Sequence, residues 1–378
     1  MTFTRCRRCV IPTTRPDTEF VGGVCSACRA YEKRATIDWP ARRRELELLL
    51  ERGKNSSGYD CIVPSSGGKD STWQVLTLIE MGAKPLVVTA TTCHLTPIGR
   101  ANIDNLACYA DTIEITPDVE VRKKLNRIGL ETVGDISWPE HISIHRLPFS
   151  LAKKHGIPLI FYGECPTEAY GGPEGSDETR AMTQRWVSEF GGFLGLRTSD
   201  VVGQYGITEH DMYPYQAPTD TELQAAGVEA YFLGQFLFWD SHRNGKVAAE
   251  AGMKQMLPGP MNWWQAENQD NYQTGIHDYF GFLKYGYGRL AAQISVDIRA
   301  GLISRERAMA VVQERDGLFP SPYMGATASS VLARIDVGQN RFMELCNQFM
   351  NKPLFAQDHV EWGQHLTLKE FACHSRAA

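Results

Sequence analysis

The chain has 378 residues, of which 43% are hydrophobic and 22% are charged, ordinary values for a globular protein long enough for two domains. It contains no run of about 18 apolar residues and no apolar stretch near Met1, which argues against a membrane-spanning helix and a secretory signal and favours a cytoplasmic protein. The formal net charge of -5 argues against a general nucleic-acid-binding protein, although residues 1–54 hold 12 Lys and Arg against 7 Asp and Glu.

Four of the ten cysteines form the pattern C-x2-C-x15-C-x2-C near the N-terminus. Each short pair can wrap around one metal ion, and two pairs complete a tetrahedral four-thiolate site for zinc. Disulfides are not expected in a reducing compartment. We therefore predict a structural Zn²⁺ site, in preference to a redox or iron–sulfur centre, formed by Cys6, Cys9, Cys25 and Cys28.

Predicted strands and helices alternate from about residue 41. The helices are expected at 41–53, 69–82, 99–110, 117–130 and about 138–155. The strands are expected at 60–64, 85–91, 112–116, 157–164 and 230–240. This alternation predicts an α/β fold with a doubly wound, mostly parallel sheet, in which ligands bind beyond the carboxyl ends of the strands.

The pattern becomes mainly helical after about residue 245. One helix is expected over 275–301, interrupted near Gly286–Gly288, and another over 304–317 with Ser304 as its N-cap. The remaining tail is expected to be helical. We predict three parts: a zinc-binding module at 1–40, a nucleotide-binding domain at 41–245 and a mostly helical C-terminal region at 246–378.

The stretch "SSGGKDS" follows the first predicted strand and opens the next helix. It is not a Walker A loop, because Val63 and Asp70 stand where that motif needs Gly and Ser or Thr. Two glycines allow a tight turn that brings backbone amides close to an anion, and the helix N-terminus points at the same place. Lys69 suits a phosphate oxygen, and Asp70 suits Mg²⁺ or bracing of the loop. The sequence therefore predicts a phosphate-binding loop made of Ser65, Ser66, Gly67, Gly68, Lys69, Asp70 and Ser71.

This loop resembles the S-G-G-x-D-S motif of the PP-loop ATP pyrophosphatase superfamily. The resemblance implies that Mg²⁺–ATP is split between its α and β phosphates, with pyrophosphate held by the loop and AMP placed on a substrate oxygen. A nucleophile, either ammonia or sulfur, then displaces AMP. No glutaminase pattern is apparent, because residue 2 is Thr and "GECPT" lacks the second glycine of a nucleophile elbow. Ammonia would then come from solution or from a partner.

Further stretches together resemble the bacterial N-acetyl sugar amidotransferases (WbpG/PseA-like) from about residue 6 to about residue 317. They are "CRRCVIPTTRPD", "GVCSACR", "SSGGKDSTWQ", "TCHLTPIGRANIDNL", "YGECPTEAYGG", "HDYFGFLKYGYGR" and "IRAGLISRERA". The resemblance implies ATP-dependent conversion of an acetamido group on a nucleotide-linked sugar into an acetamidino group, in surface polysaccharide or flagellar glycan synthesis. It also implies that a separate glutaminase, paired with a barrel-type subunit, supplies the ammonia. One departure is Cys165, where relatives are expected to have Asn.

Residues outside the loop complete the predicted site. Gly163 and Glu164 end a strand on the ligand side of the sheet, where Gly163 is expected to contact ATP and Glu164 to bind Mg²⁺ or ribose. Thr91 follows the strand beside which superfamily members commonly place adenine. Lys284 and Arg289 suit the negative charge of an adenylated intermediate or a sugar diphosphate.

The sugar nucleotide is expected to contact further residues that follow strands or share helix faces. The predicted substrate contacts are His94, Arg100, Asn102, Tyr170, Gly171, Gly172, His277, Asp278 and Tyr285. For residues 170–172 the alternative is a simple turn without a role in binding. For His277, Asp278 and Tyr285 the alternative is a solvated helix face.

The main alternative function is that of a PP-loop tRNA thiolase, since several of these also carry Cys-rich zinc modules. Such an enzyme needs a broad basic surface, against which the acidic isoelectric point of about 6.1 argues. It also needs a catalytic cysteine near the loop, for which Cys61, Cys93 and Cys165 are candidates. A scaffold that binds ATP only as a structural ligand is a third, non-enzymatic reading.

Overall fold

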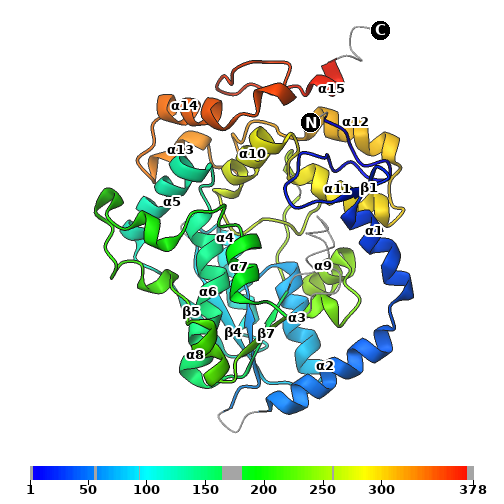
Figure 1. Cartoon of the computed structure of the whole chain (residues 1–378), viewed down its shortest axis with the longest axis vertical. Helices are drawn as coiled ribbons and strands as arrows, with labels where there is room; N and C mark the ends of the chain where they lie inside the picture. The colour runs from blue at the N-terminus through cyan, green and yellow to red at the C-terminus, as the bar shows by residue number, and fades with distance from the viewer. Residues whose placement is uncertain (1–2, 55–57, 93, 164–180, 258, 373–378) are drawn as a thin grey trace.

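The computed structural model describes residues 3–54, 58–92, 94–163, 181–257 and 259–372. In these residues a five-stranded sheet has the order β5-β4-β3-β6-β7, and every neighbouring pair is parallel (Figure 1). The strands are β3 (Cys61–Pro64), β4 (Pro85–Ala90), β5 (Thr112–Ile115), β6 (Leu159–Tyr162) and β7 (Glu229–Phe232). The predicted parallel α/β sheet is therefore confirmed. Its strand order reverses between β3 and β6, which is where ligands bind in open sheets of this kind.

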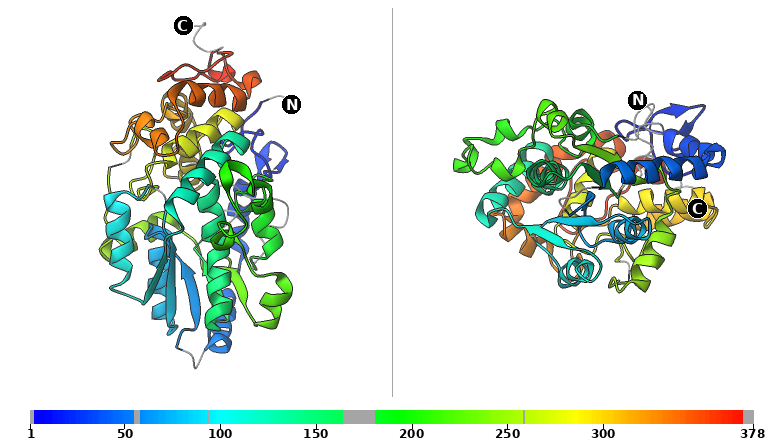
Figure 2. Two further views of the ribbon diagram at one scale, coloured as in Figure 1. Left: turned by 90° about the vertical axis from the view of Figure 1, so that its left-hand side faces the viewer. Right: turned by 90° about the horizontal axis from the view of Figure 1, so that it is seen from below.

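Helices cover both faces of the sheet (Figure 2). Side chains alternate along β3, so that Cys61 and Val63 enter one core while Ile62 enters the other. The first face carries α2 (Trp39–Gly53), α3 (Lys69–Glu80) and α4 (Pro97–Leu106), with α9 (Ser241–Glu250) packed on α3. The second face carries α5 (Val119–Val133), α6 (Trp138–His155), α7 (Gln184–Phe190) and α8 (Asp220–Ala225).

Two predicted elements differ from the structure. The strand expected at 230–240 ends at Phe232, and a 3-10 turn, η5 (Leu233–Gln235), follows it. The apolar run continues because Phe236 and Trp239 are buried in the core under α2 and α3, and an apolar run does not by itself distinguish a strand from a buried turn. The helix expected at 99–110 begins earlier, because Thr96 caps it by accepting a hydrogen bond from Gly99 N at 2.9 Å.

The C-terminal region is built from helices, as predicted, and lies at one end of the molecule (Figure 1). The break expected near residue 286 is present, since Gly286 ends a helix with a φ of +71°. Ser304 caps the helix that follows it by accepting from Arg307 N at 3.3 Å. The helices are α10 (Thr274–Tyr285), α11 (Arg289–Arg299), α12 (Arg305–Arg315), α13 (Ala328–Ala333), α14 (Gln339–Phe349) and α15 (Lys369–Ala372).

The N-terminal segment shares its hydrophobic core with these C-terminal helices and not with the sheet. It contains an antiparallel hairpin of two short strands, β1 (Phe20–Val21) and β2 (Val24–Cys25), each of two residues. The helix α1 (Ser26–Lys33) follows this hairpin. Figure 1 shows this segment beside α11 and α12. Helix α2 then leads the chain back to the sheet.

None of the helices in the described residues combines the length and the apolar character needed to cross a membrane.

Candidate active site

The loop between β3 and α3 is held in its turn by hydrogen bonds that its own serines make. Ser65 N donates to Val88 O of the neighbouring strand at 2.9 Å. The Ser65 hydroxyl donates to Ser71 Oγ at 2.7 Å and accepts from Gly67 N at 3.0 Å. No side chain caps α3, which begins at Lys69, so its first backbone N–H groups remain available to an anion. This is the geometry that a phosphate-binding loop needs.

Gly67 is required for backbone reasons, and we expect Gly67→Ala to weaken both ATP binding and folding. Its φ is +79°, and an added Cβ would lie 2.6 Å from the backbone carbon of Asn102 in α4. Gly82 is a matched control, because its φ is +82° but an added Cβ would meet nothing within 4 Å. Gly82→Ala should therefore cost only about 1–2 kcal/mol of backbone strain, whereas Gly67→Ala should cost roughly 1–3 kcal/mol more from crowding. Denaturant unfolding and ATP titration of both variants would check this, and equal effects would contradict it.

Lys69 is held between two carboxylates. Its Nζ lies 2.6 Å from Asp70 Oδ2 and 2.7 Å from Glu267 Oε2, and the residue is only 6% exposed. Burial lowers the pKa of Lys69, but the charges of Asp70 and Glu267 outweigh it and leave the pKa above its usual value. The buried Asn244 in α9 donates to Asp70 Oδ1 at 2.9 Å. A charged lysine is thus positioned at the start of α3, on the anion side of the loop.

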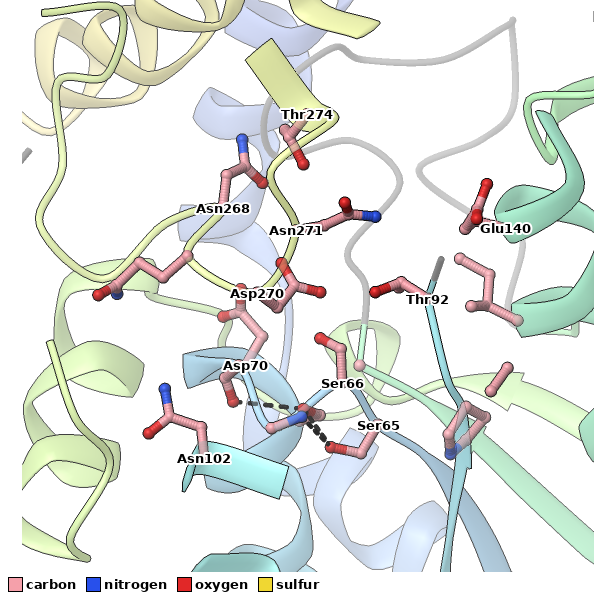
Figure 3. A pocket seen from close by; sticks show the side chains of 18 of the residues that line it. Ser65, Ser66, Asp70, Thr92, Asn102, Glu140, Asn268, Asp270, Asn271 and Thr274 are labelled. Atoms are coloured by element: carbon pink, nitrogen blue, oxygen red, sulfur yellow. Dashed lines mark hydrogen bonds between the residues drawn. The ribbon is translucent and has the colours of Figure 1, made fainter. Parts of the chain in front are cut away.

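A polar segment, residues 266–271, lies over the loop (Figure 3). It rests on the start of α4, where Thr96 N donates to Asp270 O at 2.9 Å and an added Cβ on Gly99 would lie 2.6 Å from Asp270 Cα. The loop and this segment enclose a cavity of about 360 Å³ together with parts of α6 and α10 and with Arg289. That volume is within the range of small-molecule sites.

Five buried polar atoms of residues that line this cavity make no hydrogen bond within the described structure. Among them are Thr92 Oγ1, just beyond β4, and Asn268 Nδ2 in the polar segment. Figure 3 shows Thr92 near the loop residue Ser66, whereas Asn268 lies farther from the loop, beyond Asp270. Buried polar groups normally have partners, so these atoms are suited to bind a ligand.

Three carboxylates, Asp70, Glu267 and Asp270, line the cavity and carry the oxygen atoms that Mg²⁺ prefers as ligands. Within the described residues they are not gathered as the ligands of one ion, since Asp70 and Glu267 pair with Lys69. Burial raises the pKa of Asp270, and nearby Glu267 raises it further. A divalent cation bound beside these carboxylates would offset their repulsion and supply positive charge to a bound phosphate.

Another part of the cavity wall combines cationic and imidazole groups. Arg289, the first residue of α11, pairs with the buried Asp278 at 3.0 Å. His277 Nδ1 lies 2.8 Å from Asp135 Oδ1, and His141 lies on the other side of that carboxylate. Burial opposes ionisation of Asp135, but His277 and His141 outweigh it and hold its pKa well below the usual value.

The cavity gathers many of the predicted site residues but not all of them. Those that line it are residues 65–71, Asn102, Gly163, His277 and Arg289. Thr91 and Arg100 instead donate to Glu114, the ring of His94 packs at a tilt against Tyr272, and Lys284 donates to Val133 O at 3.2 Å. Tyr285 packs on Tyr287, and Asp278 acts on the cavity through Arg289. Glu164, Cys165, Tyr170, Gly171 and Gly172 lie outside the described residues.

Several residues in and around the cavity were not predicted from the sequence. Those that line it are Glu140, His141, Glu267 and Asp270, while Asp135 and Asn244 lie behind it and contact His277 and Asp70, respectively. The polar run "QAENQDN" at 265–271, which stands between apolar stretches, was a signal for Glu267 and Asp270. The others lie in or beside ordinary helices and carry no local pattern.

The four N-terminal cysteines lie together, as their spacing predicted. All four are buried and their Sγ atoms lie within 4.8 Å of one another, with Cys6–Cys28 at 3.9 Å and Cys9–Cys25 at 3.6 Å. These separations suit four thiolates about 2.3 Å from one Zn²⁺ ion. Backbone N–H groups of Arg8 and Cys25 point at Cys6 Sγ, each at 3.4 Å, and the Arg299 guanidinium lies 4.0 Å from Cys28 Sγ. The donor set and its surroundings therefore fit zinc.

Comparisons with known proteins agree with the sequence reading of the C-terminal region. Residues 266–369 match the family model described as "LPS biosynthesis protein WbpG-like, C-terminal domain". A search of curated proteins finds no match. Among solved structures, the chain is similar to NMN synthetase from Francisella tularensis, with 10% sequence identity and a TM-score of 0.28 over 59% of this chain and 99% of that one. A likeness this distant carries no functional argument.

The matched region contributes Glu267, His277 and Arg289 to the cavity that the loop opens into. The resemblance seen in the sequence is thus confirmed for this region, and residues 266–369 form a WbpG-like C-terminal domain.

Proposed function

We propose that the protein is an ATP-dependent amidotransferase that converts an acetamido group of a nucleotide-linked sugar into an acetamidino group, releasing AMP and pyrophosphate. One observation carries this proposal: the PP-loop and Arg289, from the WbpG-like C-terminal domain, face one cavity. The same proposal includes Mg²⁺ bound with ATP and a structural Zn²⁺ held by the four cysteines. Its context would be the synthesis of a surface polysaccharide or a flagellar glycan.

The first half of the reaction is transfer of AMP. The acetamido oxygen attacks the α phosphorus, the bond to the bridging oxygen breaks, and pyrophosphate leaves with that oxygen. Lys69 and the free amides at the start of α3 would bind the departing pyrophosphate, whose negative charge grows as the bond breaks. Holding ATP and the acetamido sugar next to each other in one cavity would further increase the rate of AMP transfer.

The second half replaces oxygen by nitrogen. Ammonia adds to the carbon that bears AMP and loses a proton, and AMP then leaves with the former acetamido oxygen. The guanidinium of Arg289 is suited to the phosphate of AMP or to the diphosphate of the sugar nucleotide, because it offers several donors in a planar fork. We propose, from the family resemblance, that a separate glutaminase with a barrel-type partner supplies the ammonia.

The tRNA thiolase alternative receives no support from Cys61. This thiol is completely buried in the core of the sheet, and burial raises its pKa above the usual value, so it is neither accessible nor readily ionised. Cys93 and Cys165 lie outside the described residues.

The proposal is tested by a pyrophosphate-release assay with ATP, Mg²⁺ and an ammonium salt. Three acceptor conditions are compared: a panel of nucleotide-linked acetamido sugars, bulk tRNA, and no acceptor. We expect release only with a sugar, together with a product in which NH replaces one oxygen. Release with tRNA alone would favour RNA modification, and ATP binding without release under any condition would favour a scaffold.

A further inference from the structure

A group of three side chains on the cavity wall takes no part in the steps proposed above. Asp135 lies between α5 and α6, His141 lies in α6, and His277 lies in α10. A carboxylate oxygen and two imidazole nitrogens from these residues lie within 4.8 Å of one another. Both imidazoles line the cavity, whereas Asp135 is only 3% exposed.

We propose that Asp135, His141 and His277 form a second metal site, for a divalent transition-metal ion such as Zn²⁺. Two imidazoles and one carboxylate are a common ligand set for such ions. Sites with three protein ligands keep a coordination position open, unlike the closed four-cysteine site. Because both imidazoles line the cavity, the open position would face the space into which the PP-loop opens.

The spacing of the donor atoms is close to that of bound ligands. His141 Nδ1 lies 3.3 Å from Asp135 Oδ2 but makes no hydrogen bond within the described residues, although it is buried. Two ligands about 2.0–2.1 Å from a tetrahedral ion are separated by roughly 3.3 Å, the distance seen here. His277 Nδ1 is hydrogen-bonded to Asp135 Oδ1 at 2.8 Å, so the ion would replace that proton and move the pair apart by about 0.5 Å.

Surrounding groups hold the three side chains in place. Ser137 N donates to Asp135 Oδ1 at 2.8 Å, and Ser137 in turn accepts from Gln273 at 3.2 Å. Gly192 makes room for His141, since a Cβ at this position would lie 2.8 Å from His141 Nδ1. Asp278 Oδ1 lies 3.9 Å from His277 Nε2, on the side of the ring away from Asp135. At this distance Asp278 makes no hydrogen bond to His277 and instead pairs with Arg289.

A water molecule or a donor atom of the substrate would take the open position. Which of these it is depends on the function proposed above, but the binding of the ion does not. The site can therefore be tested without any substrate.

The test is a metal count on the full-length protein. Purified protein is equilibrated with Zn²⁺, passed through a desalting column, and measured by elemental analysis alongside His277→Gln, Asp135→Asn and Cys9→Ser. A matched control is His359→Ala: His359 also lies between two carboxylates, 2.7 Å from Asp358 and 3.0 Å from Glu361, but its side chain is 61% exposed. Circular dichroism confirms that each variant is folded.

We expect the wild-type protein and His359→Ala to retain about two Zn²⁺ ions per chain, and His277→Gln and Asp135→Asn about one. With Co²⁺, Cys9→Ser should keep visible d–d absorption but lose the thiolate-to-cobalt charge-transfer band. Equal metal content in wild type, His277→Gln and Asp135→Asn would overturn the proposal. If the wild-type protein retains two Zn²⁺ ions per chain but shows no sugar-dependent pyrophosphate release, only the amidotransferase function is refuted. If it retains one ion per chain and turns over fully, only the second metal site is refuted.

Discussion

Replacing Lys69 with alanine is expected to reduce sugar-dependent pyrophosphate formation by about 10²–10³-fold, the usual effect of removing one group that stabilises developing charge. Lys69 is the residue that begins α3, and its ammonium group is buried beside the phosphate loop. In the absence of ATP its partners are Asp70 and Glu267. Binding of Mg²⁺–ATP would give it phosphate oxygens as further partners, and its attraction for them would increase as pyrophosphate leaves. The initial rate of pyrophosphate release measures the effect.

The control for this variant is Lys84→Ala. Lys84 lies just before β4, at the opposite end of the strand from the phosphate loop, and its ammonium group packs over Tyr59. Lys84→Ala should have wild-type activity. Because Lys69→Ala leaves two carboxylates facing each other, its unfolding is compared with that of the double variant Lys69→Ala/Glu267→Gln, which relieves the repulsion. A stable double variant with wild-type rates would show that Lys69 has only a structural role.

Removing one N-terminal thiol is expected to have the largest effect on stability. Cys9→Ser should lose the zinc ion of the four-cysteine site and lower the melting temperature by roughly 10 °C, because metal binding in such sites is coupled to folding. The effect should spread beyond the N-terminal segment, since Cys9 and its neighbours belong to the hydrophobic core formed by α10, α11, α12 and α14. Arg305 in α12 also donates to the backbone oxygens of Cys6 and Cys9, at 3.2 and 3.1 Å. Differential scanning calorimetry and elemental analysis measure the two changes.

Cys108→Ser is the matched control, because Cys108 is exposed and lies outside the four-cysteine cluster. It should leave both the zinc content and the melting temperature unchanged. If Cys9→Ser melts like Cys108→Ser, the four cysteines do not hold a structural metal.

The sequence was informative where structure depends on neighbouring residues. Buried parallel strands are continuous apolar runs, so β3, β4 and β6 were recognisable, and parallel strands place the segments after them at one edge of the sheet. The phosphate loop was predictable for the same reason, because its glycines, serines and lysine are consecutive. The spacing of the four cysteines likewise predicted that they lie together, as the structure shows.

Partners distant in the chain could not be predicted. Glu267 is 198 residues from Lys69, and His277 is 142 residues from Asp135. The family resemblance placed His277 and Arg289 in the site, but nothing in the local sequence indicates that residues 266–271 lie over the phosphate loop. The strand β7 was predicted too long because Phe236 and Trp239 are as apolar as strand residues, although they fill the core from a turn. Long-range packing therefore decided which polar residues belong to the site.

The most direct test of the account follows one oxygen atom. A nucleotide-linked sugar labelled with ¹⁸O in its acetamido carbonyl is incubated with the protein, unlabelled ATP, Mg²⁺ and ammonia, and the AMP is analysed by mass spectrometry. If the acetamido oxygen attacks the α phosphorus, as proposed, each AMP formed carries one ¹⁸O and the sugar product carries none at that position. Unlabelled AMP formed together with an acetamidino product would contradict adenylation of the acetamido oxygen and with it the central claim.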